Sequence, residues 1–213
     1  MIGVEDKEQL FRLIADYIEK DVECVAIGGT AMMFLGYKAT TKDIDLVFKN
    51  KKDREVFCSA IEKLGYLRKS ARFVYEAKKL NQRTMPLLYS RSDERFDLFA
   101  MDVFGYKLNF DNFLQRHDYI GKRELIIFTA PKEELVILKA VTNRDKDYED
   151  IEIIAKTENP DWGRIVDMAI ARREQMPWIL IDLEEKMQKL KKVTFIKKEV
   201  FEKLYKAERN AQK

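Results

Sequence analysis

The chain has 213 residues, of which 46% are hydrophobic and 36% charged, and its formal net charge is +3. This hydrophobic content is enough for a folded core and excludes wholesale disorder. The charged fraction exceeds the roughly 25% of ordinary soluble domains and is typical of thermophile-like proteins. No apolar run approaches a membrane span, and the first residues carry acids rather than a signal sequence. We therefore expect a cytoplasmic protein that does not enter a membrane.

The apolar pattern predicts a mixed α+β part followed by a helical part. Apolar residues spaced three or four apart predict helices, and short β-branched or alternating runs predict strands. Up to Ala130 these patterns predict helices at 5–20, 30–37 and 53–64, and strands at 22–27, 43–48, 73–77, 86–89, 96–104 and 124–129. From Pro131 onward they predict helices beginning near 131, 147, 180 and 196. We expect an α/β core over residues 1–130, with a helical part over 131–213 packed on it.

The chain has few histidines and cysteines that could bind a metal or act as a nucleophile or base. The chain has one histidine, His117, and two cysteines, Cys24 and Cys58. These are too few for a Ser-His-Asp triad, a histidine-rich zinc site or a disulfide framework. Catalysis by this chain would have to use carboxylates, lysines and hydroxyls.

Gly28, Gly29 and Thr30 stand where the predicted strand 22–27 ends and the next helix begins. Glycine allows a backbone to approach a ligand closely, and amides at the start of a helix attract anions. The Thr30 hydroxyl could bond a phosphate oxygen. Taken alone, two glycines before a helix more often form a tight turn without a ligand.

Asp43 and Asp45 alternate with apolar residues on the predicted strand 43–48. Residues i and i+2 of a strand face the same side, about 6–7 Å apart. Two such carboxylates repel each other unless water or a cation lies between them, and Mg²⁺ is a suitable cation. The alternative is an exposed strand edge with two solvated carboxylates.

A third carboxylate comes from the predicted strand 96–104. Asp97 lies between apolar neighbours, where an unpaired charge is costly. If its strand lies beside Asp43 and Asp45, the three carboxylates converge on a site for two metals. Asp102 competes for this role, and we prefer Asp97 because its flanking residues are more apolar.

This order of motifs resembles the DNA polymerase beta nucleotidyltransferase superfamily, in particular AbiEii-like toxins of type IV toxin–antitoxin systems and related minimal prokaryotic members. The resemblance lies in Gly28 to Ala31 and in Thr41 to Leu46, which read Gly-Gly-Thr-Ala and Thr-Lys-Asp-Ile-Asp-Leu. It implies a nucleotidyltransferase fold with a mixed β-sheet flanked by helices. It also implies Mg²⁺ or Mn²⁺ at Asp43, Asp45 and Asp97, and a nucleoside triphosphate such as ATP as substrate. Relatives often carry an arginine two residues before the threonine, where this chain has Ala39.

The resemblance continues downstream, with a lysine inside an apolar run and then Arg-x-x-Asp-x-x-Asp. Here these are Lys139, followed by Arg144, Asp147 and Asp150. By resemblance Lys139 contacts the nucleotide, and Thr41, Arg144, Asp147 and Asp150 support the site. A lysine reaching solvent at a helix edge, and acids favoured in a first helical turn, are the alternatives.

The sequence therefore predicts a metal-dependent transferase that moves a nucleoside monophosphate to an acceptor hydroxyl on an RNA or tRNA end or on a protein. Two basic stretches, Arg68 to Arg95 and residues 184–213, favour RNA; the second carries 10 basic and 5 acidic residues. A cognate antitoxin is a further expected partner. The alternative function is a non-catalytic module of the same fold that binds a nucleotide or a protein.

Overall fold

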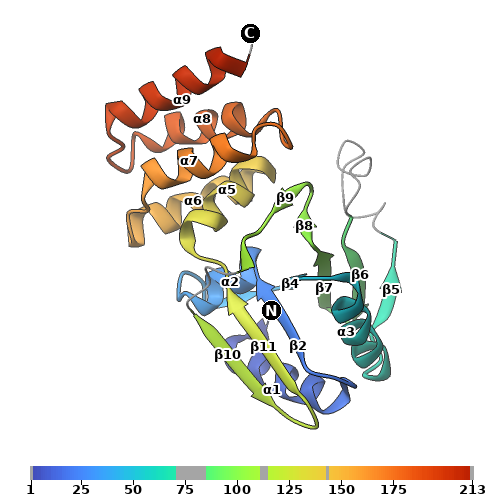
Figure 1. Ribbon diagram of the computed structural model, residues 1–213. Coiled ribbons are helices and arrows are strands. Elements are labelled where there is room, and N and C mark those ends of the chain that lie inside the picture. Colours follow the sequence, from blue (N-terminus) through green and yellow to red (C-terminus); the bar gives the residue numbers. More distant parts are fainter. Residues whose placement is uncertain (1, 71–84, 111–114, 143, 212–213) are drawn as a thin grey trace. The chain divides into compact units, whose positions relative to one another are not determined.

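The computed structural model describes residues 2–70, 85–110, 115–142 and 144–211 (Figure 1). The chain divides into two compact units, Met1–Ala130 and Pro131–Lys213. The strand expected at 73–77, and the middle of the basic stretch between Arg68 and Arg95, lie outside the described residues.

The first unit is built on a mixed β-sheet with the strand order β10-β11-β2-β4-β7-β6-β5. At its centre, β4 pairs antiparallel with β2 and parallel with β7. On the other side β11 pairs parallel with β2. The strands are β2 (Val22–Ala26), β4 (Asp43–Phe48), β5 (Leu67–Lys69), β6 (Leu87–Arg91), β7 (Glu94–Ala100), β10 (Arg116–Ile120) and β11 (Glu124–Thr129).

The described part of this unit also contains four short strands. β8 (Asp102–Val103) and β9 (Tyr106–Lys107) extend the sheet from β7, and β1 (Ile2–Gly3) pairs with β3 (Thr40–Thr41) in a separate two-stranded sheet. The mixed sheet with its helices is the α+β architecture predicted from the apolar pattern.

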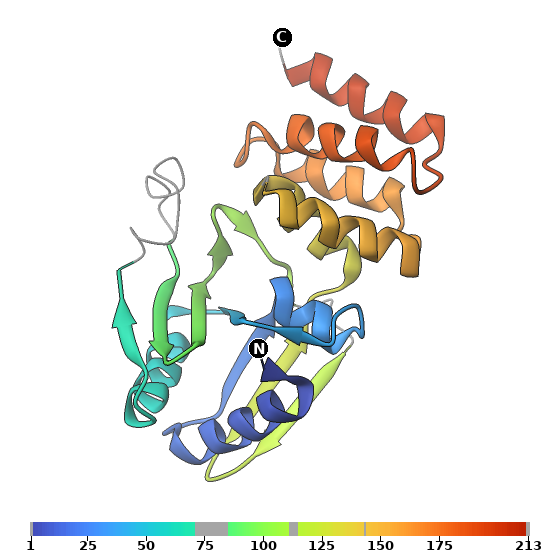
Figure 2. The ribbon, with the colours of Figure 1, turned by 180° about the vertical axis from the view of Figure 1, so that it is seen from behind.

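Among the residues that the structure describes, three helices accompany the sheet: α1 (Val4–Tyr17), α2 (Gly28–Phe34) and α3 (Lys51–Lys63). α1 and α3 pack on each other and on the sheet, α1 against β10 and β11, and α3 against β2, β4 and β7 (Figure 2). Phe11 and Ile14 of α1 and Phe57 of α3 are fully buried there, which explains the apolar spacing of both helices. α2 lies against β4, and this contact positions the candidate site.

Two predicted elements that carry candidate site residues were wrong in their extent. The helix expected at 30–37 begins at Gly28, so both glycines belong to its first turn. The strand expected at 96–104 is two strands, because Met101 has a φ of 73° and the chain turns back, which pairs Asp102 with Ala100. Methionine is not a typical turn residue, so the sequence carries no signal for this reversal.

The second unit is a stack of helices: α5 (Lys132–Thr142), α6 (Asp145–Thr157), α7 (Trp162–Arg172), α8 (Ile179–Leu190) and α9 (Lys198–Ala211). α5 contacts α6, α7 and α8, and α9 contacts α7 and α8. α7 was not predicted. An aspartate such as Asp161 is a common helix N-cap, and here its side chain accepts a hydrogen bond from the Arg164 amide. Within the described ranges, no helix combines the length and apolar character needed to cross a membrane.

Candidate active site

The aspartates expected to act together lie on the neighbouring strands β4 and β7. In the parallel register of these strands, Asp43 is paired with Arg95 and Asp45 with Asp97. Ile44 is fully buried while Asp43 and Asp45 are partly exposed, so the predicted alternation is observed. Asp97 itself is only 2% exposed.

Asp102, the rival third carboxylate, has a different environment. It lies on β8, and its carboxylate accepts a hydrogen bond of 2.8 Å from the Gly105 amide. This bond closes the turn between β8 and β9. The register of β4 and β7 favours Asp97 for the cluster.

Gly28 and Gly29 bring the first turn of α2 close to β4. Gly28 has a φ of 55°, and a Cβ there would lie 2.5 Å from Oδ2 of Asp45. A Cβ at Gly29 would lie 2.5 Å from Oγ1 of Thr41. Only glycine fits such an approach without displacing its neighbour. The glycine pair therefore places backbone directly against the carboxylate of Asp45.

Three side chains hold the backbone of Asp43 at the start of β4. Its carbonyl oxygen accepts hydrogen bonds from Thr30 Oγ1 at 3.3 Å, from Thr41 Oγ1 at 3.3 Å and from Lys7 Nζ at 3.2 Å. The Thr30 hydroxyl also accepts a bond of 3.1 Å from the amide of Asp45. Thr30 is fully buried, and its hydroxyl makes both of these bonds to β4. The predicted contact between this hydroxyl and a phosphate oxygen stays a prediction.

Lys7 is a site residue that the sequence analysis missed. It is fully buried, and burial lowers the pKa of its ammonium group to about 8, against the carboxylates of Asp45, Asp43 and Glu94, which favour the charged form. Lys7 precedes the buried Leu10, Phe11 and Ile14 by three, four and seven residues. This spacing places it on the core face of α1 and was the available signal.

Arg95 is a second missed residue. Its Nη2 lies 2.7 Å from Asp43 Oδ2, and its Nε lies 2.8 Å from Asp97 Oδ1. Arg95 stands two residues before Asp97 on β7, so both face the same side of the strand. A basic residue at this spacing was a readable signal for a partner of the carboxylate.

The carboxylates of Asp43, Asp45 and Asp97 are suitable ligands for a hard divalent cation, but Arg95 contacts two of them. Among the residues that the structure describes, no three His, Cys, Asp or Glu side chains are grouped so that they could hold a metal ion. The guanidinium of Arg95 lies between Asp43 and Asp97. Carboxylate oxygens are the ligands that Mg²⁺ and Mn²⁺ prefer, and this cluster already binds a cation. The residues therefore fit Mg²⁺ in chemistry.

The second group of predicted residues comes together within the helical unit. Lys139 of α5 forms ion pairs with Asp150 and, at 3.7 Å, with Asp147. Asp147 also accepts hydrogen bonds from Arg144 Nε at 2.7 Å and from Thr142 Oγ1 at 2.6 Å. Lys139, Asp147 and Asp150 are all at most 6% exposed. Lys139 is therefore a buried counter-ion, not a lysine extending into solvent.

The pKa of Asp147 reflects this environment. Burial acts to raise it, but the hydrogen bond from Arg144, the charge of Lys139 and the bond from Thr142 together outweigh burial and lower it. Asp147 thus stays ionised inside the helical unit.

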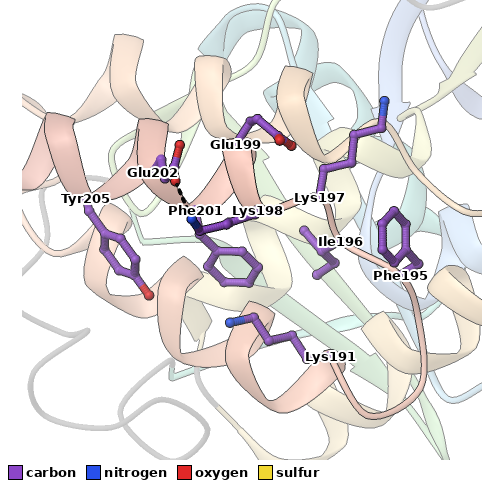
Figure 3. Close-up of a pocket in the computed structure, with 9 residues that line it drawn as sticks. All are labelled: Lys191, Phe195, Ile196, Lys197, Lys198, Glu199, Phe201, Glu202 and Tyr205. Carbon is purple, nitrogen blue, oxygen red and sulfur yellow. Dashed lines mark ion pairs between the residues drawn. The ribbon is translucent and has the colours of Figure 1, made fainter.

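A separate pocket of about 510 Å³ lies between the end of α8 and the start of α9 (Figure 3). It is lined by Lys191, by residues 195–199, and by Phe201, Glu202 and Tyr205 of α9. Lys191 Nζ lies 3.8 Å from the ring centroid of Phe201, and Phe195 is 77% exposed. This pocket joins aromatic rings to lysines in the basic C-terminal part of the chain.

The solved structures to which this chain is similar are remote in sequence. ANT(2″)-Ia in complex with adenylyl-2″-tobramycin has a TM-score of 0.48 and 16% identity, covering 79% of this chain and 97% of that one. A solution structure of the antibiotic-resistance factor ANT(2″)-Ia has the same TM-score and identity, covering 84% and 97%. An H. pylori protein described as a nucleotidyltransferase has a TM-score of 0.42 and 13% identity, covering 99% and 93%. No curated protein matches the sequence.

A family model, in contrast, matches residues 8–206 and therefore nearly the whole chain. The match confirms the predicted fold and the assignment as a nucleotidyltransferase, whereas the closer likeness to AbiEii-like toxins is not confirmed by it. The chain belongs to the family described as nucleotidyltransferase of unknown function (DUF6036).

Proposed function

We propose that this chain transfers a nucleoside monophosphate from a nucleoside triphosphate to an acceptor hydroxyl, with Mg²⁺ or Mn²⁺ held by Asp43, Asp45 and Asp97. The observation that carries the proposal is the register of β4 and β7, which sets Asp45 of β4 directly beside Asp97 of β7. Asp43 lies on β4, two residues before Asp45. A bound divalent ion neutralises the charge of the triphosphate and of the departing pyrophosphate.

The residues of the chain then have distinct roles. Asp97 orients the acceptor hydroxyl and takes its proton while the hydroxyl oxygen bonds to the α-phosphorus. The bond from that phosphorus to the β-phosphate oxygen breaks, and pyrophosphate leaves. The backbone at Gly28 and Gly29, which already approaches Asp45 and Thr41, lies beside the triphosphate together with Thr30.

The remaining predicted residues are assigned to nucleotide binding or to supporting the site. We assign nucleotide binding to Lys139, with Arg144, Asp147 and Asp150 holding it in place. The buried ion pairs of Lys139 support the positioning part of this assignment. Thr41 supports the site through its bond to the Asp43 carbonyl.

Pyrophosphate release tests the reaction itself. The wild-type protein, given Mg²⁺, a nucleoside triphosphate and cellular RNA or protein as acceptor, should release pyrophosphate, and Asp43→Asn should abolish the release. Asp102→Asn is the matched control, because its carboxylate closes a turn outside the cluster. A wild-type rate in the Asp43→Asn variant would contradict the proposal.

As acceptor we propose an RNA end, and the pocket between α8 and α9 supports this choice. Proteins that bind single-stranded RNA combine basic side chains with aromatic rings on which bases stack. Phe195 is an exposed ring flanked in sequence by Lys191, Lys197 and Lys198 (Figure 3). Phe195→Ala should weaken transfer to RNA by about tenfold, since base stacking contributes about 1–3 kcal/mol per base.

The matched control for Phe195→Ala is Ile181→Ala, since Ile181 is an exposed apolar residue outside that pocket. Exclusive labelling of protein acceptors, unaffected by Phe195→Ala, would exclude RNA as the acceptor.

The toxin-like role and the cognate antitoxin are proposals that rest on the AbiEii resemblance alone. Expression of the chain in the cytoplasm, where we place it, should then arrest growth, and Asp43→Asn should relieve the arrest. Normal growth with an active enzyme would contradict the toxin role while leaving nucleotidyl transfer intact.

A further inference from the structure

Arg95 occupies the carboxylates to which the proposed metal would bind. One guanidinium nitrogen, Nη2, lies 2.7 Å from Asp43 Oδ2 and 3.3 Å from Asp97 Oδ2, and Nε lies 2.8 Å from Asp97 Oδ1. Both oxygens of Asp97 are thus engaged by one side chain. Arg95 is 29% exposed and Asp97 only 2%, so this contact is partly shielded from water.

The guanidinium of Arg95 and a divalent metal would compete for the same carboxylate oxygens, Oδ2 of Asp43 and both oxygens of Asp97. A guanidinium donates hydrogen bonds in a fixed fork, along the lone-pair directions that a metal would also need. Its charge also repels a divalent cation at the same oxygens. We propose that Arg95 is the resident counter-cation of this carboxylate cluster, and that it must leave Asp43 and Asp97 before a divalent metal binds them. The inference rests on the proposed function, which names these aspartates as metal ligands.

The exchange needs only side chains to move. The backbone of Asp43 is held by Lys7, Thr30 and Thr41, whatever its carboxylate contacts. Arg95, in contrast, reaches the cluster through a long side chain with several rotatable bonds. The strands therefore keep their register while the guanidinium gives way to the metal. Arg95 competes with the metal, and the apparent metal affinity equals the intrinsic affinity multiplied by the fraction of protein in which Arg95 has left the aspartates.

Direct metal binding without nucleotide tests the inference independently of activity. The dissociation constant for Mn²⁺ is measured by calorimetry on the wild-type protein, Arg95→Gln, Asp43→Asn and Arg91→Gln. Arg91 is the matched control because it is also an arginine of this sheet, paired with Glu94 rather than with the aspartates. Arg95→Gln should bind Mn²⁺ about tenfold more tightly than the wild type, a change typical of losing one competing charge-assisted contact. Arg91→Gln should stay within about twofold.

Thermal melts supply a second readout. Without metal, Arg95→Gln should melt below the wild type because Asp43 and Asp97 lose their cation, and Mn²⁺ should raise its melting temperature more than that of the wild type. Mn²⁺ affinity in Arg95→Gln equal to or weaker than that of the wild type overturns the competition. If the wild type binds Mn²⁺ and Asp43→Asn does not, the proposed metal site is still supported even when the competition is disproved. If neither the wild type nor Arg95→Gln binds Mn²⁺, the metal site fails as well.

Discussion

Gly28 lies so close to Asp45 that a Cβ on the glycine would stand 2.5 Å from the carboxylate oxygen Oδ2. This contact joins the first turn of α2 to the acidic strand β4. The position of one carboxylate of the candidate site thus depends on a residue that has no side chain.

Gly28→Ala should lower both stability and transfer activity, because the new methyl group displaces the Asp45 carboxylate. Gly36→Ala is the matched control: Gly36 also has a positive φ, of 77°, but nothing lies within 4 Å of its Cβ position. Each variant has a backbone cost of about 1–2 kcal/mol, and only Gly28→Ala adds the clash. Urea unfolding and steady-state rates measure both effects. Equal activity in the two variants would show that the contact with Asp45 is unimportant.

Asp97→Asn should lower turnover by about 10²-fold or more, as expected for a group that takes a proton in the transition state. Asp102→Asn should stay near the wild-type rate, because an amide oxygen still accepts the bond from Gly105. Single-turnover rates at saturating nucleotide separate the two variants. The reverse order of activities would transfer the role of third carboxylate to Asp102.

Lys139→Met should destabilise the protein by about 3–5 kcal/mol, the usual effect of removing one partner from a buried ion pair. Asp147 and Asp150 would both lose their ammonium partner. Adding Asp150→Asn removes the excess charge and should restore part of the stability, while Asp147 keeps its bond from Arg144.

The double variant also separates the two roles of Lys139. If Lys139 binds the nucleotide, Lys139→Met with Asp150→Asn stays inactive although it is folded. A folded and active double variant would reduce Lys139 to a structural ion-pair partner. Melting curves beside nucleotide titrations provide the comparison.

The chain should lose stability as the pH falls below about 6.5, in part through His117. Burial lowers the pKa of this histidine, whose ring stacks on Phe34 at 4.1 Å and whose Nε2 lies 3.1 Å from Thr129 Oγ1. The unfolded chain binds a proton near pH 6.5, whereas the folded protein resists it, so acid favours unfolding. His117→Phe keeps an aromatic ring and should flatten the dependence between pH 7.5 and 5.5 in urea titrations. An unchanged slope would exclude His117 as its source.

The sequence predicted most of the elements whose pattern is local. The strand at Asp43–Phe48 and the strand at Glu124–Thr129 are observed with those bounds, because short runs of mostly buried apolar residues mark both strands in the sequence. Strand β10 was missed, since its polar residues alternate with few apolar ones and pairing with β11 stabilises it. Such pairing depends on distant segments, which a local pattern does not encode.

The sequence pointed to the carboxylates of the candidate site but not to its basic residues, Lys7 and Arg95. Asp43, Asp45 and Asp97 stand out because acids interrupt apolar strands. Lys7 belongs to a segment 36 residues before Asp43, and only the packing of α1 brings its ammonium to that carbonyl. Arg95 lay within a predicted basic stretch, where its charge suggested RNA rather than a pair of aspartates. Its actual partners, Asp43 and Asp97, follow from the β4–β7 register.

The decisive measurement for nucleotidyl transfer follows the label of a nucleoside triphosphate. Parallel reactions contain Mg²⁺, cellular RNA and protein, and triphosphate labelled at either the α- or the γ-phosphate. We expect α-label to become attached to a macromolecule and γ-label to be released only as pyrophosphate. Asp43→Asn and Asp45→Asn should abolish both outcomes. Attachment of the γ-label, or α-labelling that persists in both variants, would contradict nucleotidyl transfer at this acidic cluster.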